Sequence, residues 1–182
     1  MAIIIAGCAV NNYGKYVNYE VTKTANATNP GSRILIVGTG TSGTNFFLDN
    51  LSDDLNRRLA QKNIRTFYFH LGNNQQEADR AFKKIVNENH CDAILHFAQV
   101  DETHNPIRLN QTPSGLPSNS GKTNMIYTRT IRYEQQFVLK YFELPDLQKT
   151  LIEANIGVKI NTLNPNDYSE ITEKIIRTLK LN

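Results

Sequence analysis

Three short apolar runs, separated by two amphipathic helical patterns, constrain the fold of this chain more than any other feature of its sequence. The runs lie at residues 33–37, 66–70 and 93–98. The first run is apolar from its second residue onward, which is typical of a strand buried on both faces of a sheet. Strands that alternate with helices in this order predict a parallel sheet with right-handed crossovers.

The two helical patterns predict where each helix lies and which side of it is buried. The second helix is expected to begin after Asn73 or Asn74, either of which can cap it, and to end near Asn89. In the first helix, acids precede bases on the polar side, as the helix dipole favours. Its expected core residues are Phe46, Phe47, Leu51, Leu55 and Leu59, and its expected polar residues are Asp49, Asp53, Asp54, Arg57, Arg58 and Lys62.

The second half of the chain has a different pattern. Residues 103–123 hold three prolines and two glycines with almost no core-forming residues, which predicts a long exposed loop. Two extended runs follow at 125–133 and 136–142, and a third follows at 150–160, so an antiparallel meander is expected. An amphipathic helix after Asn164 closes the chain. The predicted fold class is therefore α/β: a three-layer-like β-α-β-α-β unit, then an antiparallel meander and a C-terminal helix on a mixed sheet.

The N-terminal sequence Ile5-Ala6-Gly7-Cys8 ends a short apolar segment and resembles a bacterial lipobox. The resemblance implies that residues 1–8 are a truncated signal, cut before Cys8, and that the Cys8 thiol carries a lipid. No Asp follows Cys8, and by resemblance to lipoprotein sorting this indicates the outer membrane. The alternative interpretation is a β-strand over residues 3–10, because β-branched residues are frequent there.

Length and composition set the remaining bounds. A chain of 182 residues suits one domain, expected at 32–182 and joined to the anchor by a polar linker at 9–31. No run approaches the roughly 20 apolar residues of a membrane-spanning helix. The net charge of +3 is spread along the chain, so no nucleic-acid partner is expected. The four histidines show no metal-ligand spacing, and His96 alternates with apolar residues as a hydrogen-bonded sheet histidine does.

A glycine-rich turn follows the first strand. Gly38, Gly40 and Gly43 satisfy the pattern G-x-G-x-x-G between a strand and a helix, which is the context of a dinucleotide-binding loop. These three glycines would be the cofactor-binding residues of an alternative function, a cytosolic Rossmann-like nucleotide-binding enzyme.

Three observations favour a structural turn over a cofactor loop. About twenty residues separate Gly43 from the second strand, and Phe46 and Phe47 follow the turn where small residues would allow close packing. No Asp or Glu ends the second strand to bind a ribose hydroxyl. We therefore expect no cofactor, and a turn that caps the helix through Thr41, Ser42 or Thr44.

No residue pattern predicts a catalytic group or a metal site. The candidate binding surface is the loop at 103–123 with the adjoining extended run. Long polar loops on rigid bodies are frequently binding elements, and Tyr and Arg are enriched at interface hot spots. The expected partner-binding residues are Tyr127, Arg129, Arg132 and Tyr133.

The order of elements resembles a group of small bacterial envelope lipoproteins. The group includes the penicillin-binding-protein activators, the curli-secretion lipoprotein and the amino-terminal domain of the Tol-system propeller protein. The resemblance rests on residues 33–37 as first strand, 50–62 as the long helix, and 137–142 with 151–154 as the meander. Where that meander usually carries Trp, this chain has Ile152. The resemblance implies a lipid-anchored periplasmic protein that binds an unidentified envelope protein.

Overall fold

The structure is a computed structural model that describes residues 16–24, 31–71, 75–100, 107–114 and 126–180. The three predicted apolar runs form the parallel strands β2 (Arg33–Thr39), β3 (Arg65–Leu71) and β4 (Ala93–Gln99), with β2 in the middle.

Two helices connect the parallel strands in the predicted order. Helix α1 (Ser42–Ala60) joins β2 to β3, and helix α2 (Gln75–Glu88) lies between β3 and β4 in the chain. The predicted β-α-β-α-β unit is therefore present.

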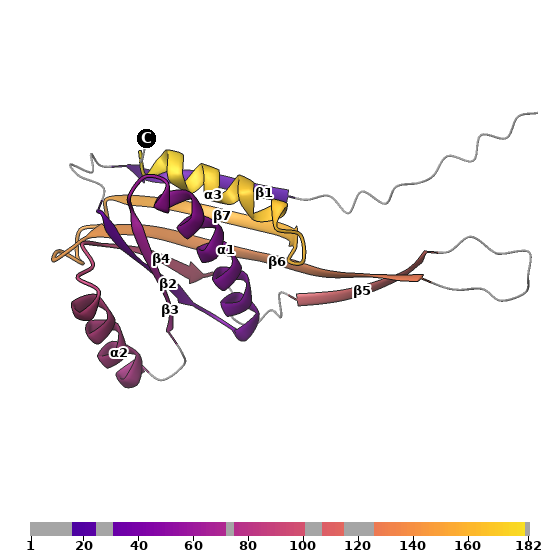
Figure 1. The fold of residues 1–182 in the computed structure, drawn as a ribbon, viewed down its shortest axis with the longest axis horizontal. Helices are drawn as coiled ribbons and strands as arrows, with labels where there is room; N and C mark the ends of the chain where they lie inside the picture. Colours follow the sequence, from indigo (N-terminus) through magenta and orange to yellow (C-terminus); the bar gives the residue numbers. More distant parts are fainter. Residues whose placement is uncertain (1–15, 25–30, 72–74, 101–106, 115–125, 181–182) are drawn as a thin grey trace, which may run out of the picture.

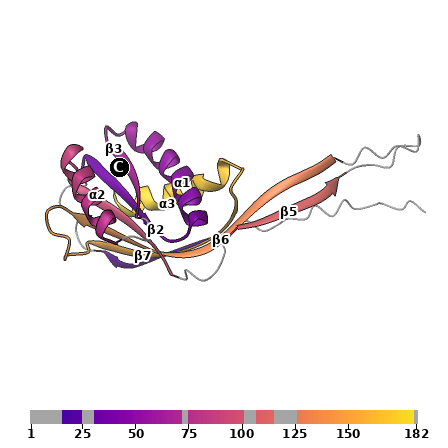
Figure 2. The same cartoon turned by 90° about the horizontal axis from the view of Figure 1, so that it is seen from below.

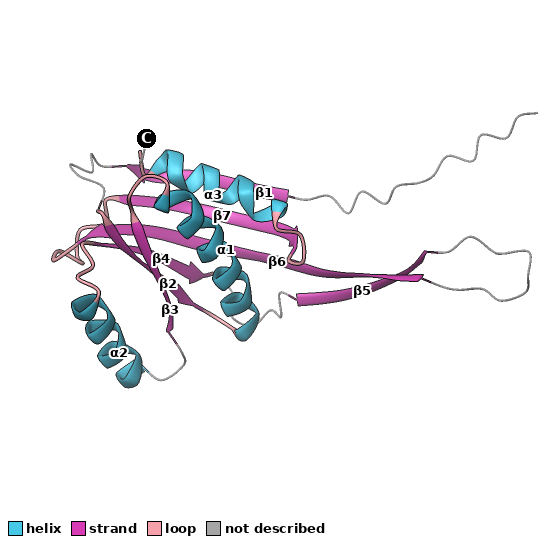
Figure 3. Ribbon diagram, in the orientation of Figure 1, coloured by secondary structure: helices cyan, strands magenta, loops and turns pink. Residues whose placement is uncertain are grey.

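Antiparallel strands complete one mixed sheet (Figure 3). Strand β6 (Ile126–Glu143) pairs with β4 on one side and with β7 (Ile152–Asn161) on the other. Strand β1 (Tyr16–Thr24) pairs with β7 at the edge, and β5 (Ile107–Ser114) pairs with β6. Within the described residues the order is β1-β7-β6-β4-β2-β3, with β5 added to β6. Helix α3 (Asn166–Thr178) follows the last strand, so the predicted α/β fold class is confirmed.

The helices cover the two faces of the sheet unequally. Helices α1 and α3 lie side by side on one face of the sheet (Figure 1). The larger core on this face includes Ile34 and Ile36 of β2 and the fully buried Phe47 of α1. Helix α2 lies on the opposite face, where Leu35 and Val37 contribute to a smaller apolar cluster. Alternate residues of β2 therefore enter two cores, as its continuous apolar sequence predicts. None of the described helices is both long and apolar enough to cross a membrane.

The amino ends of β2 and β4 are held together by one carboxylate. Asp92, the residue before β4, accepts hydrogen bonds from the backbone N–H groups of Ser32 and Arg33, each at 2.9 Å. The Ser32 hydroxyl also donates to Asp92, at 3.0 Å. A Cβ at Gly31 would lie 2.1 Å from Asp92 Oδ1, so only glycine fits beside this carboxylate.

Strand β5 and the first part of β6 extend beyond the helices as a two-stranded arm, defined here as residues 107–114 and 126–133 (Figure 1). The predicted long loop at 103–123 is thus wrong for residues 107–114. The two extended runs predicted from 125 to 142 are one strand, β6. The extended run at 125–133 was predicted, but its pairing with residues 107–114 was not, because that pairing joins segments separated by the stretch between them in the chain.

The predicted linker at 9–31 also contains structure. Residues 16–24 form β1, and its Val17 and Tyr19 pack against the larger core. These two residues alternate with exposed ones, so an extended segment at 16–21 is visible in the sequence, but its place in the sheet is not. Cys8 and the alternative strand at 3–10 lie outside the described residues.

Candidate docking site at the base of the arm

The arm leaves the body where β2 and β4 end and α1 begins, so the glycine-rich turn lies at its base. Gly40 has a φ of +142°, and a Cβ there would lie 2.3 Å from the side-chain oxygen of Gln99. A Cβ at Gly38 would lie 2.5 Å from Leu48 Cδ1. Both glycines therefore make room for side chains of this chain, because any larger residue would displace them.

Gln99 fills the space above the turn. Its Oε1 accepts hydrogen bonds from the Thr41 N–H, at 3.1 Å, and from the Thr44 hydroxyl. Thr41 is the N-cap of α1, and its hydroxyl accepts from the Thr44 N–H at 3.4 Å. The Tyr133 hydroxyl donates to Thr44 Oγ1 at 3.3 Å, which makes a relay from Tyr133 through Thr44 to Gln99. The predicted capping of the helix by the turn is confirmed at Thr41.

This arrangement gives the glycine-rich turn a structural explanation. In a dinucleotide-binding loop, the amides at the helix N-terminus hold a pyrophosphate. Here the neutral amide oxygen of Gln99 accepts the hydrogen bond of the Thr41 N–H. Gly43 is a buried residue of the first turn of α1. The geometry therefore favours a turn that closes the end of the sheet.

Tyr133 was predicted to lie on the docking surface, and its position contradicts this. Its side chain is fully buried and stacks on Phe47, with ring centroids 4.5 Å apart and planes 9° from parallel. Burial raises the pKa of its phenol above the ordinary value. Its backbone pairs with both Ile107 of β5 and Ile160 of β7. Tyr133 is thus the core residue at which the arm joins the body.

The other three predicted partner-binding residues lie in the arm. The structure describes their backbone as part of β6 and nothing of their side chains. In the register of the arm, Tyr127, Arg129 and Arg132 are opposite Pro113, Gln111 and Arg108.

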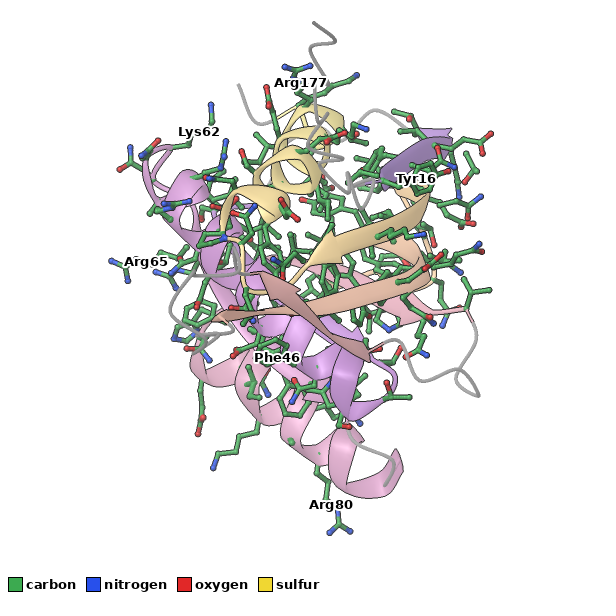
Figure 4. All side chains as sticks on the ribbon, turned by 90° about the vertical axis from the view of Figure 1, so that its right-hand side faces the viewer. Tyr16, Phe46, Lys62, Arg65, Arg80 and Arg177 are labelled. Carbon is green, nitrogen blue, oxygen red and sulfur yellow. The ribbon has the colours of Figure 1, made fainter. Side chains whose placement is uncertain are left out.

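A pocket of about 490 Å³ opens beside the base of the arm, between the first half of α1 and the segment that leads into α3. Phe46 and Leu163 line it, and their side chains are 43% and 51% exposed. Figure 4 looks at the molecule from the side of the arm, with Phe46 labelled. Phe46 was predicted to be a core residue, but consecutive helix residues point about 100° apart, so only Phe47 reaches the core. The other lining residues are Asn50, Asp53, Asp54, Arg57, Thr162, Pro165 and Tyr168.

Asp54 departs from its predicted place on the polar side of α1. It is buried, and it accepts hydrogen bonds from Arg57 and, at 3.2 Å, from Arg58 Nε. Arg58 also donates to the Ser169 hydroxyl of α3, so the buried charge links the two helices. Asp53 is exposed at the same pocket. The pocket therefore combines apolar side chains with the exposed carboxylate of Asp53 and the exposed guanidinium of Arg57, a combination that suits a partner with an apolar side chain beside polar or charged ones.

Sequence reasoning missed Gln99 and Leu163. A polar residue at the carboxyl end of a strand next to the glycine-rich turn was a usable signal for Gln99. Leu163 gave no signal, because single exposed apolar residues are common on protein surfaces. Among the described residues, no three His, Cys, Asp or Glu side chains lie together as a metal site would require.

Comparisons with known proteins identify neighbours in structure only. No protein-family model matches the sequence, and no curated protein matches it. The PelC dodecamer from Paraburkholderia phytofirmans is 9% identical, with 91% of this chain and 97% of that chain covered and a TM-score of 0.47. A leucine-to-methionine variant of that dodecamer is 7% identical, with 93% and 100% covered and a TM-score of 0.47.

Proposed function

We propose that this protein is a lipid-anchored accessory protein of the bacterial cell envelope and acts through contacts with another envelope protein. The lipobox-like sequence ending at Cys8 supports the anchor, and the missing Asp after it supports the periplasmic face of the outer membrane. The likeness of the element order to penicillin-binding-protein activators and related envelope lipoproteins supports the class.

The position of β1 limits how far the domain can lie from a lipid anchor at Cys8. The sheet begins at Tyr16, eight residues after Cys8. A chain of that length spans at most roughly 30 Å when fully extended. An acylated Cys8 would therefore hold the domain close to the membrane surface, and a partner would be a protein within that reach.

The observation that carries the binding role is the arm with the pocket at its base. The arm projects from a body with short connections, and Phe46 and Leu163 expose apolar surface beside it (Figure 2). Tyr127, Arg129 and Arg132 supply residue types that are frequent at interface hot spots. We place the contact on these elements.

Labelled palmitate tests the anchor. In cells that express the chain behind an intact signal, the label should be incorporated, and Cys8→Ala should abolish it. Cys91→Ala is the matched control, because Cys91 is a buried thiol of the body and its loss should leave labelling unchanged. Palmitate on the Cys8→Ala variant would contradict the anchor.

Site-specific photocrosslinking tests the contact. A crosslinking residue at Phe46 should give one discrete adduct with an envelope protein, identified by mass. The same residue at Leu147, which is 42% exposed at the far end of β6, is the control and should give none. Equal adducts from both positions, or an adduct at Leu147 alone, would place the contact elsewhere.

Replacement of residues 109–130 by a short Gly/Ser turn tests the arm separately. Tyr133 stays in this variant, so its stacking on Phe47 and the fold of the body should be retained, with an unchanged near-ultraviolet spectrum. The Phe46 adduct should weaken strongly. A folded variant that still forms the adduct would exclude the arm from the contact.

The alternative function, a cytosolic nucleotide-binding enzyme, is favoured by one observation, the sequence of the glycine-rich turn before α1. A nucleotide at a hundred times its dissociation constant would stabilise the fold by about 2.7 kcal/mol. Because Gln99 occupies the turn, we expect no shift in melting temperature with saturating NAD, NADP, ATP or GTP. A shift of several degrees that Gly40→Val removes would favour the enzyme.

A further inference from the structure

The two edge strands of the sheet differ in how well they are protected against pairing with another chain. At one edge, β1 carries a register shift between Val21 and Lys23, and it includes the charged Glu20 and Lys23. Irregularities and charges of this kind prevent edge-to-edge association. At the other edge, β3 pairs with β2 in an unbroken register, and no residue after Arg65 is charged.

The side chains of β3 also differ from those of an ordinary solvent-facing edge. Phe67, Tyr68 and Phe69 are three consecutive aromatic residues, and every residue from Thr66 to Leu71 is only half-buried. Helices α1 and α2 lie on either side of this strand and leave its outer edge between them (Figure 2). Regular backbone and incompletely buried aromatic side chains are the features of an edge that adds a further strand.

One backbone hydrogen bond shows which groups of β3 point outward. The Arg65 N–H donates to the Ser32 carbonyl at 2.9 Å, so the amide of Arg65 faces the β2 side. Backbone groups alternate in direction along a strand. The N–H and C=O groups of Thr66, Tyr68 and His70 therefore point to the outer edge, where no strand of the described residues pairs with them.

We propose that this edge of β3 pairs with the same edge of a second copy of this chain, so that the two sheets become continuous across a two-fold axis at Tyr68. In this antiparallel register, Thr66 of one copy lies opposite His70 of the other, and Tyr68 lies opposite Tyr68. Each of these pairs exchanges two hydrogen bonds, about six in all. All three outward-facing residues of each copy are then paired.

The side chains fit the same register. Phe67 of one copy lies opposite Phe69 of the other, twice, and aromatic cross-strand pairs stabilise sheets. The two Arg65 side chains lie at opposite ends of the paired strands, roughly 20 Å apart, so no like charges meet. The second copy is favoured over an unrelated extended peptide because β3 complements itself in both hydrogen bonding and aromatic pairing. The dimer does not depend on the proposed lipid anchor or on the arm.

Sedimentation equilibrium of the full chain over a range of concentrations tests the proposal. The chain should be dimeric, and Thr66→Pro should weaken the dimer roughly tenfold or more. The substitution removes one outward N–H from each copy and leaves the β2 pairing intact. Thr66→Ala keeps that N–H and is the matched control, so it should remain dimeric. A monomer at every concentration, or a dimer that Thr66→Pro leaves unchanged, would overturn the proposal.

A distance measurement tests the register and covers the case in which Thr66→Pro fails to fold. Arg65 is exposed, so a spin label at Arg65→Cys in a Cys8→Ala background should leave the fold intact. The two labels of the dimer should give one distance centred in the range of about 15–30 Å, given the spacing of the two positions. A distance well beyond this range, or no intermolecular distance, would overturn the register. Binding of an extended segment of another protein in place of a second copy would also give no distance.

Discussion

The two ends of β4 are closed in different ways. At its amino end, the carboxylate of Asp92 accepts hydrogen bonds from two backbone N–H groups and the Ser32 hydroxyl. At its carboxyl end, the amide oxygen of Gln99 accepts from the Thr41 N–H and the Thr44 hydroxyl. Asp92 is half-buried, whereas Gln99 is buried.

The difference follows from the cost of removing a charge from water. A half-buried carboxylate keeps part of its hydration and can serve three donors, but a buried one would lose that hydration. A neutral amide closes the buried end at lower cost, even though a helix N-terminus favours an anion. The carboxyl end of these parallel strands, where open α/β sheets usually bind ligands, is therefore built here as part of the core.

The largest effect is expected at the amino end. Asp92→Ala should lower the free energy of unfolding by about 3 kcal/mol, because two backbone N–H groups and a hydroxyl lose a charged acceptor. Denaturant unfolding measures this loss. Asp92→Asn keeps one acceptor oxygen and should lose less. Equal losses for the two variants would show that the neutral acceptor oxygen contributes nothing and that the charge carries the whole effect, whereas wild-type stability of Asp92→Asn would show that the charge contributes nothing.

At the carboxyl end the loss should be smaller. Gln99→Ala should cost about 2 kcal/mol, since it leaves the Thr41 N–H and the Thr44 hydroxyl without this acceptor. Gln99→Glu tests whether this helix N-terminus prefers a neutral acceptor or a negative charge. We expect it to be less stable than the wild type at neutral pH. Higher stability would mean that the helix terminus prefers a charge, and the contrast between the two ends would disappear.

Gly40→Ala should cost about 1.5 kcal/mol, because its φ of +142° and the contact with Gln99 both disfavour a Cβ. In a Gln99→Ala background the contact with Oε1 is gone, while the backbone strain and the 3.0 Å approaches to the Cβ of residue 99 and to Thr44 Cγ2 remain. The cost should therefore fall, and a double-mutant cycle measures the difference. Full additivity would show that Gln99 does not determine the need for glycine.

The smallest effect concerns His96, midway along β4, whose Nε2 lies 3.4 Å from the Thr39 hydroxyl. Burial, with a smaller contribution from Lys140, lowers its pKa below the ordinary value of about 6.5. Below that pH the unfolded chain binds a proton that the folded chain rejects, so stability should decline as pH falls from 6.5. His96→Asn should reduce this slope in unfolding measured from pH 7 to 5. Burial also lowers the pKa of His70. His70 therefore accounts for part of the pH dependence that remains in the His96→Asn variant.

The sequence predicts those parts of the fold that depend on local periodicity. The three parallel strands, the two helices between them and the Thr41 cap follow from apolar spacing and from the chemistry of one side chain. His96, predicted as a hydrogen-bonded sheet histidine, lies within reach of the Thr39 hydroxyl.

The errors arise where the outcome depends on pairing between distant segments. Tyr133 lies on the same face of β6 as Phe137, Leu139 and Tyr141, which are all buried. A prediction of one continuous strand over 126–143 would therefore have placed Tyr133 in the core. The role of Gln99 depends on β4 lying beside β2, so its place at the carboxyl end of a strand is the one signal that the sequence offers for it. The two strands of the arm are held together by backbone pairing between β5 and β6, which composition does not reveal.

Strand β6 runs without interruption from the arm into the body, and this continuity has a mechanical consequence. A pull on the arm would be transmitted along β6 to its ladders with β4 and β7. Force directed along a strand loads many hydrogen bonds in shear at once, whereas force across a strand peels them one at a time. Tension along the arm would thus be borne by the whole sheet, and the arm would detach less readily than a hairpin tethered by a flexible loop.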